Sequence, residues 1–252
     1  MSITAPLFLF LFLASTFIAS LTSGLTGFAA GLVVSGVWLQ ILSPQQTAML
    51  IACYGVINQS YAVWKLRRAF SFRRIIPFVA GGLIGVPAGT ILVGTIDPAA
   101  VKFTVGALLI CYSAYGLFRP AIKAIASNNA VDSGIGVLNG LLGGLTGLGG
   151  VIVTIWVQLR DWPKDVQRSV FQPVIFTTMA ITVLSNLASG SFTFEVAKLF
   201  LLGLPALGAG LWIGMRLYGR LDDAVFRKAV LVVLFISGVS LLLTPIVTPE
   251  TS

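Results

Sequence analysis

The chain has 252 residues, of which 57% are hydrophobic and 10% are charged, and its formal net charge is +8. A soluble domain carries roughly a quarter of charged residues, so this composition excludes an ordinary soluble protein. It predicts instead an all-α polytopic membrane protein. The chain has no histidine, and its two cysteines lie inside predicted helices. We therefore expect no metal site, no cofactor and no catalytic residues, and hence no enzyme.

The predicted elements begin with a hairpin of two apolar helices over about residues 5–42, which reverses at a glycine-rich phrase. Three single crossings follow, over about 47–65, 75–95 and 99–118. A second hairpin over about 133–159 reverses at a similar phrase. The last three crossings cover about 168–188, 195–216 and 224–244.

The basic residues fix the orientation of these elements. Fourteen of the sixteen fall into four loops: Lys65, Arg67, Arg68, Arg73 and Arg74; Arg119 and Lys123; Arg160, Lys164 and Arg168; and Arg216, Arg220, Arg227 and Lys228. The connections between these loops carry no basic residue, as the positive-inside rule predicts for loops on the outer side. We expect a multi-pass protein of the bacterial inner membrane, with four cytoplasmic basic loops and both termini outside. This arrangement explains the net charge without a nucleic-acid partner.

The chain is also internally repeated. Gly24-Leu25-Thr26-Gly27 recurs as Gly144-Leu145-Thr146-Gly147, 120 residues later, and Pro44 matches Pro163. Each half, 1–125 and 126–252, then contains one hairpin and three crossings within one integral membrane domain. Because three is odd, the second half is predicted to be inverted in the membrane, as in many secondary transporters.

Two ladders of small residues accompany the repeat. They are Gly81, Gly85 and Gly89 in the first half, and Ala206, Gly210 and Gly214 in the second. Small residues at a spacing of four let helices approach closely in lipid, so we interpret both ladders as packing surfaces.

The two glycine phrases are interpreted differently, as breaks that bind an anion. Backbone freed from a helix at membrane depth is tolerated only beside protein or a water-filled cavity. Helices that restart after each break point partly positive N-termini and free N–H groups at it, which favours a compact oxyanion. This site needs no buried arginine. Its predicted residues are Gly24, Thr26, Gly27 and Phe28 with Gly144, Thr146, Gly147, Leu148 and Gly149.

Polar residues follow in the helix after each hairpin. They are Tyr54, Asn58 and Gln59 in the first half, and Gln172 and Thr177 in the second. Such residues can simply bond neighbouring helices, for less than about 2 kcal/mol each. Because both groups occupy the same place in their repeat, we interpret them as the lining of a substrate path.

These residues carry a resemblance to the TauE/SafE family of sulfite and sulfonate exporters. Members have two homologous halves, each with an early glycine-rich motif, a proline-ended helix, a polar stretch and a basic loop. The corresponding segments here are Gly24 to Gly27, Pro44, Tyr54 to Ser60 and Lys65 to Arg68, and then Gly144 to Gly150, Pro163 and Phe171 to Thr178. The resemblance covers nearly the whole chain. It implies a secondary transporter whose partner is a small sulfur oxyanion, such as sulfite, or an organosulfonate.

All eight acidic residues fall in predicted loops or at helix ends, so no mid-membrane carboxylate is expected to relay protons. Export of an anion from a negatively charged cytoplasm gains roughly 2.3 kcal/mol per charge per 100 mV. Export is therefore expected. The alternatives that the sequence leaves open are an anion channel of the same fold, an uptake permease for a related anion, and a membrane enzyme or assembly factor. A homodimer in the lipid bilayer also stays open.

Overall fold

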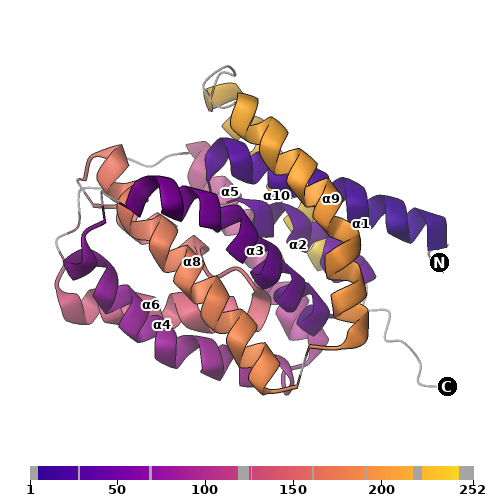
Figure 1. Ribbon diagram of the computed structural model, residues 1–252, viewed down its shortest axis with the longest axis horizontal. Helices are drawn as coiled ribbons and strands as arrows, with labels where there is room; N and C mark the ends of the chain where they lie inside the picture. Colours follow the sequence, from indigo (N-terminus) through magenta and orange to yellow (C-terminus); the bar gives the residue numbers. More distant parts are fainter. Residues whose placement is uncertain are drawn as a thin grey trace.

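The structure is a computed structural model that describes residues 5–27, 29–67, 70–118, 125, 127–160, 162–190, 192–217 and 223–243. This part of the chain forms helices and no strands (Figure 1). The helices are α1 (Ala5–Thr26), α2 (Ala30–Ile41), α3 (Pro44–Leu66), α4 (Phe72–Val93), α5 (Pro98–Phe118), α6 (Asn129–Thr146), α7 (Val151–Gln158), α8 (Lys164–Ala188), α9 (Phe194–Leu217) and α10 (Asp223–Leu243).

The predicted all-α polytopic class is confirmed. In the described residues, α1, α4, α5, α8 and α9 are long and apolar enough to cross a membrane, by length and composition. Helix α3 has 23 residues but a more polar composition. Large apolar side chains cover the outer surface, with Phe10, Ile84, Ile91, Phe103 and Leu201 each more than 60% exposed. A surface of this kind suits contact with lipid rather than water.

Each predicted hairpin consists of a long helix followed by a short one. Helix α1 is followed by α2, which has 12 residues, and α6 is followed by α7, which has 8 residues. At 1.5 Å per residue these return arms are about 18 and 12 Å long. Neither can cross a hydrocarbon core of about 30 Å, so each arm re-enters only part of the membrane.

The helices that follow the hairpins both begin at a proline. Pro44 is the first residue of α3, and Ser43 before it forms a capping box with Gln46, each backbone N–H meeting the other side chain at 3.2 Å. Pro163 is the N-cap of α8. Helix α8 therefore begins four residues before the predicted start at 168, which places Arg168 on a helix rather than in a loop.

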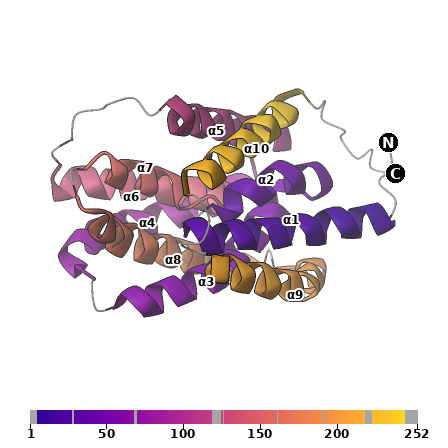
Figure 2. The same cartoon turned by 90° about the horizontal axis from the view of Figure 1, so that it is seen from above.

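Glycine ladders join helices from opposite halves of the chain. A Cβ on Gly81, Gly85 or Gly89 of α4 would overlap with a carbonyl oxygen of α6. Gly210 and Gly214 of α9 face carbonyl oxygens of α1 in the same way. The prediction that these glycines pack helices is confirmed. The pairs α4–α6 and α1–α9 lie side by side, and α3–α8 and α5–α10 also contact each other (Figures 1 and 2).

Candidate functional site

The first hairpin reverses at Gly27, whose φ of 90° lies in the left-handed region that favours glycine. Its amide donates to the carbonyl of Ser23 over 2.7 Å, which ends α1. Its own carbonyl accepts a hydrogen bond from Nε2 of Gln59 on α3 over 2.9 Å. The backbone freed at this break is therefore satisfied by a side chain from another helix, as buried backbone requires.

Two side chains of α8 also lie against Gly27. A Cβ on this glycine would lie 2.8 Å from Nε2 of Gln172 and 3.7 Å from Nη2 of Arg168. Arg168 is half-buried, so the expectation of a site without a buried arginine stays a prediction. Helix α8 begins at Lys164, and from its second turn the long side chain of Arg168 reaches the break across the boundary between the halves.

The second hairpin reverses at Gly147, whose φ is 76°. Its amide donates to the carbonyl of Gly143 over 2.8 Å, which ends α6. A Cβ on Gly147 would lie 2.7 Å from the carbonyl oxygen of Ala48 and 2.8 Å from the Cβ of Ile51, both on α3. Backbone and a branched Cβ cannot swing aside, so this break is packed tightly against α3.

Thr146 stabilises the second break from within. Its hydroxyl donates to the carbonyl of Leu142 over 2.7 Å and accepts from the amide of Leu148 over 3.1 Å. The hydroxyl proton is thus already used, and Thr146 can donate to an anion only by giving up the bond to Leu142.

Asn139 joins the two arms of the second hairpin. Its Nδ2 donates to the carbonyl of Gly149 over 3.1 Å, and its Oδ1 accepts from the amide of Val153 over 3.3 Å. Its Nδ2 also lies 3.4 Å from the hydroxyl of Thr178 on α8. One buried amide therefore satisfies both a carbonyl and an N–H group at the start of α7. The matching position in the first half, 120 residues earlier, is Ala19, which has no such group.

A cavity of about 50 Å³ lies where the two return arms begin. Ala30 and Gly31 at the start of α2 line it, together with Gly150 and Val151 at the start of α7. Neither N-cap residue bonds the first turn of its helix with a side chain. The N-terminal ends of two helix dipoles therefore meet at one cavity, although in α7 the amides of Val151 and Val153 are already bonded, to the carbonyl of Leu148 and to Oδ1 of Asn139. The polar residues of its wall are Thr16, Ser20, Ser23, Tyr54, Asn58 and Gln59.

Three buried amide side chains, two in the wall of the cavity and one beside Gly27, lack a full set of partners. Oδ1 of Asn58, Oε1 of Gln59 and Oε1 of Gln172 are buried and accept no hydrogen bond within the part of the chain that the structure describes. A buried polar atom without a partner costs about 1–3 kcal/mol. A primary amide can turn by 180° and present its NH₂ group instead. Asn58 can present either group to a polar occupant, whereas Gln59 is held in its orientation by the bond from its Nε2 to the carbonyl of Gly27.

Five of the fourteen predicted site residues line the cavity: Tyr54, Asn58, Gln59, Gly147 and Leu148. The hydroxyl of Tyr54 is turned away, since it donates to the α9 carbonyls of Leu199 and Phe200 at 2.9 Å each. Tyr54 therefore contributes its ring rather than its hydroxyl.

Three of the predicted glycines lie in packed interfaces. A Cβ on Gly24 would lie 2.9 Å from the Cα of Gly214 on α9, and one on Gly144 would overlap with the backbone of α4. A Cβ on Gly149 would overlap with the side chain of Thr178 on α8. These glycines hold helices close to the site.

The other predicted site residues lie outside the wall of the cavity or outside the described residues. The hydroxyl of Thr177 donates to the carbonyl of Pro173 in its own helix over 2.8 Å. Gln172 lies beside the first break, as described above. Phe28 and the side chain of Thr26 lie outside the described residues.

Sequence reasoning missed several residues of the site. Thr16, Ser20 and Ser23 line the cavity from α1, and their spacing of four and three places them on one helical face. That signal was present in the sequence. Asn139 offered a weaker signal, because it is a single amide among the small and apolar residues of its helix. Arg168 offered none, because its position is typical of a cytoplasmic loop.

The long apolar helices and the two partial hairpins define a polytopic helical membrane protein with a cavity between the hairpins. Residues 11–241 match the family described as sulfite exporter TauE/SafE. The chain belongs to this family of membrane transporters. No curated protein and no solved structure matches the chain.

Proposed function

We propose that the chain is a secondary transporter that exports a small sulfur oxyanion such as sulfite, and that the anion binds in the cavity where α2 and α7 begin. One observation carries this proposal: the starts of both return arms and the amides of Asn58 and Gln59 meet at a single cavity. Membership of the TauE/SafE family supports the class of substrate.

The anion would be held mainly by the chain's own amides. The first-turn N–H groups of α2 supply donors, and the dipoles of α2 and α7 favour negative charge there. The NH₂ group of Asn58, turned toward the cavity, adds a side-chain donor. Arg168 and Gln172, beside Gly27, place a full positive charge and a further donor next to the first break.

The size of the cavity favours a compact anion. About 50 Å³ holds roughly four water molecules, at about 10–15 Å³ each. Sulfite fits this volume better than a longer organosulfonate, which would require the hairpins to move apart.

The proposed mechanism treats the halves as inverted repeats. In support of this, α1 pairs with α9 as α6 pairs with α4, so that corresponding helices exchange partners between the halves. The start of α1 and the end of α10 lie at the same end of the molecule, which supports placing both termini outside (Figure 2). Alternating access would then arise from movement of the hairpins around the cavity.

The charges support export as the direction of transport. Asp132 is the buried acidic residue of the described chain, and Arg160 pairs with it at 3.0 Å. That carboxylate is already neutralised, which leaves the membrane potential to favour anion exit. An anion channel and an uptake permease for a related anion remain the alternatives.

The test is calorimetric titration of sulfite into purified protein. Arg168→Gln and Asn58→Leu should each weaken binding by about ten- to a hundred-fold, because a hydrogen bond to a charged group contributes about 1.5–3 kcal/mol. Asn186→Leu is the matched control, since Asn186 is a buried amide bonded within its own helix and away from the cavity. Normal binding by both site variants would remove the cavity as the site.

Transport in proteoliposomes then separates carrier from channel. A carrier should exchange labelled sulfite outside for trapped sulfite inside, at a rate that saturates. Flux that rises linearly with concentration would support the channel.

A further inference from the structure

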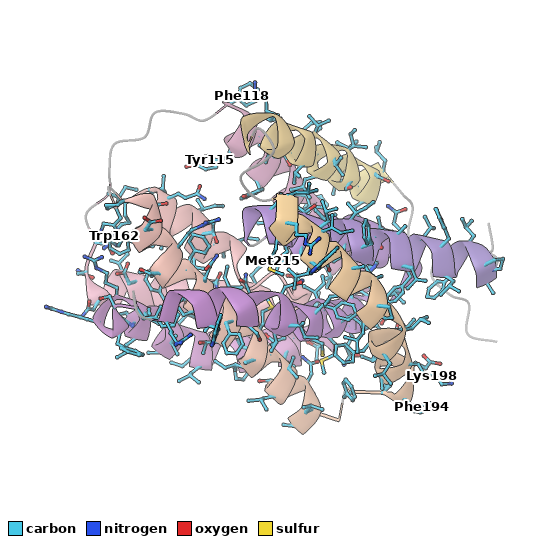
Figure 3. All side chains as sticks on the ribbon, turned by 45° about the horizontal axis from the view of Figure 1, so that its top comes forward. Tyr115, Phe118, Trp162, Phe194, Lys198 and Met215 are labelled. Carbon is cyan, nitrogen blue, oxygen red and sulfur yellow. The ribbon has the colours of Figure 1, made fainter. Side chains whose placement is uncertain are left out.

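A second hollow lies at the end of the molecule where α4, α6 and α8 begin, and it shares no residue with the central cavity. Its volume is about 350 Å³. Figure 3 shows Trp162 at this end, opposite the end that carries Phe194 and Lys198. We name this second hollow the arginine hollow. The charged and aromatic residues of its wall are Arg73, Arg74, Asp132, Arg160 and Trp162.

The charges in the arginine hollow do not balance. Three guanidinium groups face one carboxylate, which leaves a net charge of about two positive units. Oδ1 of Asp132 accepts from Nη1 of Arg160 at 3.0 Å and from Nε1 of Trp156 at 2.9 Å. The hydroxyl of Ser127 donates to the same oxygen at 2.8 Å. Asp132 is thus committed to Arg160.

Arg73 and Arg74 are exposed and have no carboxylate partner among the described residues. Both stand in the first turn of α4, where the positive end of the helix dipole disfavours a cation. The guanidinium of Arg74 lies 4.7 Å from the ring centre of Trp162, and that of Arg160 lies 4.6 Å from the same ring. One indole therefore holds two like charges near each other. A bound anion would offset both unfavourable arrangements.

We propose that the arginine hollow is a second binding site, for a phosphate-type oxyanion, with Arg73 and Arg74 as its ligands. The planar fork of a guanidinium matches two oxygens of such an anion, and an ammonium group does not. Arg160, fixed by Asp132 and stacked on Trp162, forms the rigid wall. The anion is either free phosphate or the headgroup of an anionic phospholipid, because both present the same oxygens.

The competing explanation is that these arginines only orient the chain in the membrane. Orientation depends on positive charge and is satisfied equally by lysine. The double variant Arg73→Lys with Arg74→Lys keeps the charge and removes the forks, so it separates the two explanations. Arg216→Lys is the matched control, because Arg216 also stacks on a tryptophan, Trp212, at 3.8 Å, but outside the hollow.

The first measurement is calorimetric titration of inorganic phosphate into the full-length protein in a neutral, lipid-free detergent. The second is retention of phosphatidylglycerol, by native mass spectrometry, after release from nanodiscs of phosphatidylcholine and phosphatidylglycerol. We expect saturable binding in at least one of them, about ten-fold weaker in the double lysine variant and unchanged in Arg216→Lys. Binding of phosphate indicates a soluble anion, and retention of lipid alone indicates a headgroup.

Either of two results would overturn the proposal. One is that wild type and the double lysine variant behave alike in both measurements. The other is that Asn58→Leu removes phosphate binding while the double lysine variant keeps it, which would assign the anion to the central cavity. Equal melting temperatures of all variants ensure that the comparison concerns binding and not folding.

Discussion

At Gly27 the chain reverses against side chains that can move, whereas at Gly147 it reverses against the backbone of α3. The first break is held from outside the hairpin by Gln59, and the second from within by Asn139 and Thr146. The same glycine phrase thus specifies a reversal in both halves without specifying how it is supported. We expect the first break to adjust when an anion binds and the second to act as a fixed wall.

The largest expected difference concerns the two glycines themselves. Gly147→Ala places a side chain in the left-handed region, at about 1–2 kcal/mol, and also overlaps with α3, which adds about 1–3 kcal/mol. Gly27→Ala has the same cost of positive φ, but its new Cβ meets only the flexible ends of Gln172 and Arg168. Thermal unfolding in detergent should therefore show a larger loss for Gly147→Ala. Equal melting temperatures would mean that both breaks are equally rigid.

A smaller difference is expected between the two supporting amides. Asn139→Leu leaves the carbonyl of Gly149 and the amide of Val153 without their partner, so the protein should lose about 1–3 kcal/mol of stability. Gln59→Leu removes one bond to Gly27 and one polar wall of the cavity, so it should weaken sulfite binding by about ten-fold. Melting temperature and calorimetry on both variants check this. If Asn139→Leu has the melting temperature of wild type, Asn139 does not support the second break.

The smallest effect is expected at Thr146. Thr146→Val removes the cap on the amide of Leu148 and should cost about 0.5–2 kcal/mol of stability, as other caps do. Thr146→Ser should retain it. The hydroxyl proton of Thr146 is already bonded to the carbonyl of Leu142. We therefore expect Thr146→Val to lower the melting temperature while it leaves sulfite affinity nearly unchanged. A ten-fold loss of affinity at normal stability would instead show that the hydroxyl binds the anion, as the sequence suggested.

The sequence predicted those features that depend on local chemistry. Gly27 and Gly147 were identifiable because a reversal at positive φ requires glycine, and the α4 ladder because close helix contact excludes a Cβ. Arg168 was not identifiable as a neighbour of Gly27. Its position depends on how far into the membrane α8 begins and on which loop of the other half meets it. Both are properties of tertiary packing.

The two supporting amides show the same limit. Asn139 has no polar counterpart at Ala19, so a repeat alignment gave no reason to select it. The sequence indicates Gln59 as a substrate ligand, and in the structure its Nε2 donates to the carbonyl of Gly27. A buried amide can serve a ligand or the backbone, and the residue type alone does not distinguish these roles.

The glycine ladders imply that neither half of the chain is a folding unit. Helix α4 buries its ladder against α6, and α9 buries its ladder against α1, so each half lacks the surface that its own glycines require. Residues 1–125 expressed alone would expose to lipid the glycine face of α4 and the face of α1 that packs on α9. The two halves are interlocked rather than joined end to end, and a break in the covalent chain between them would leave an assembly that still holds together.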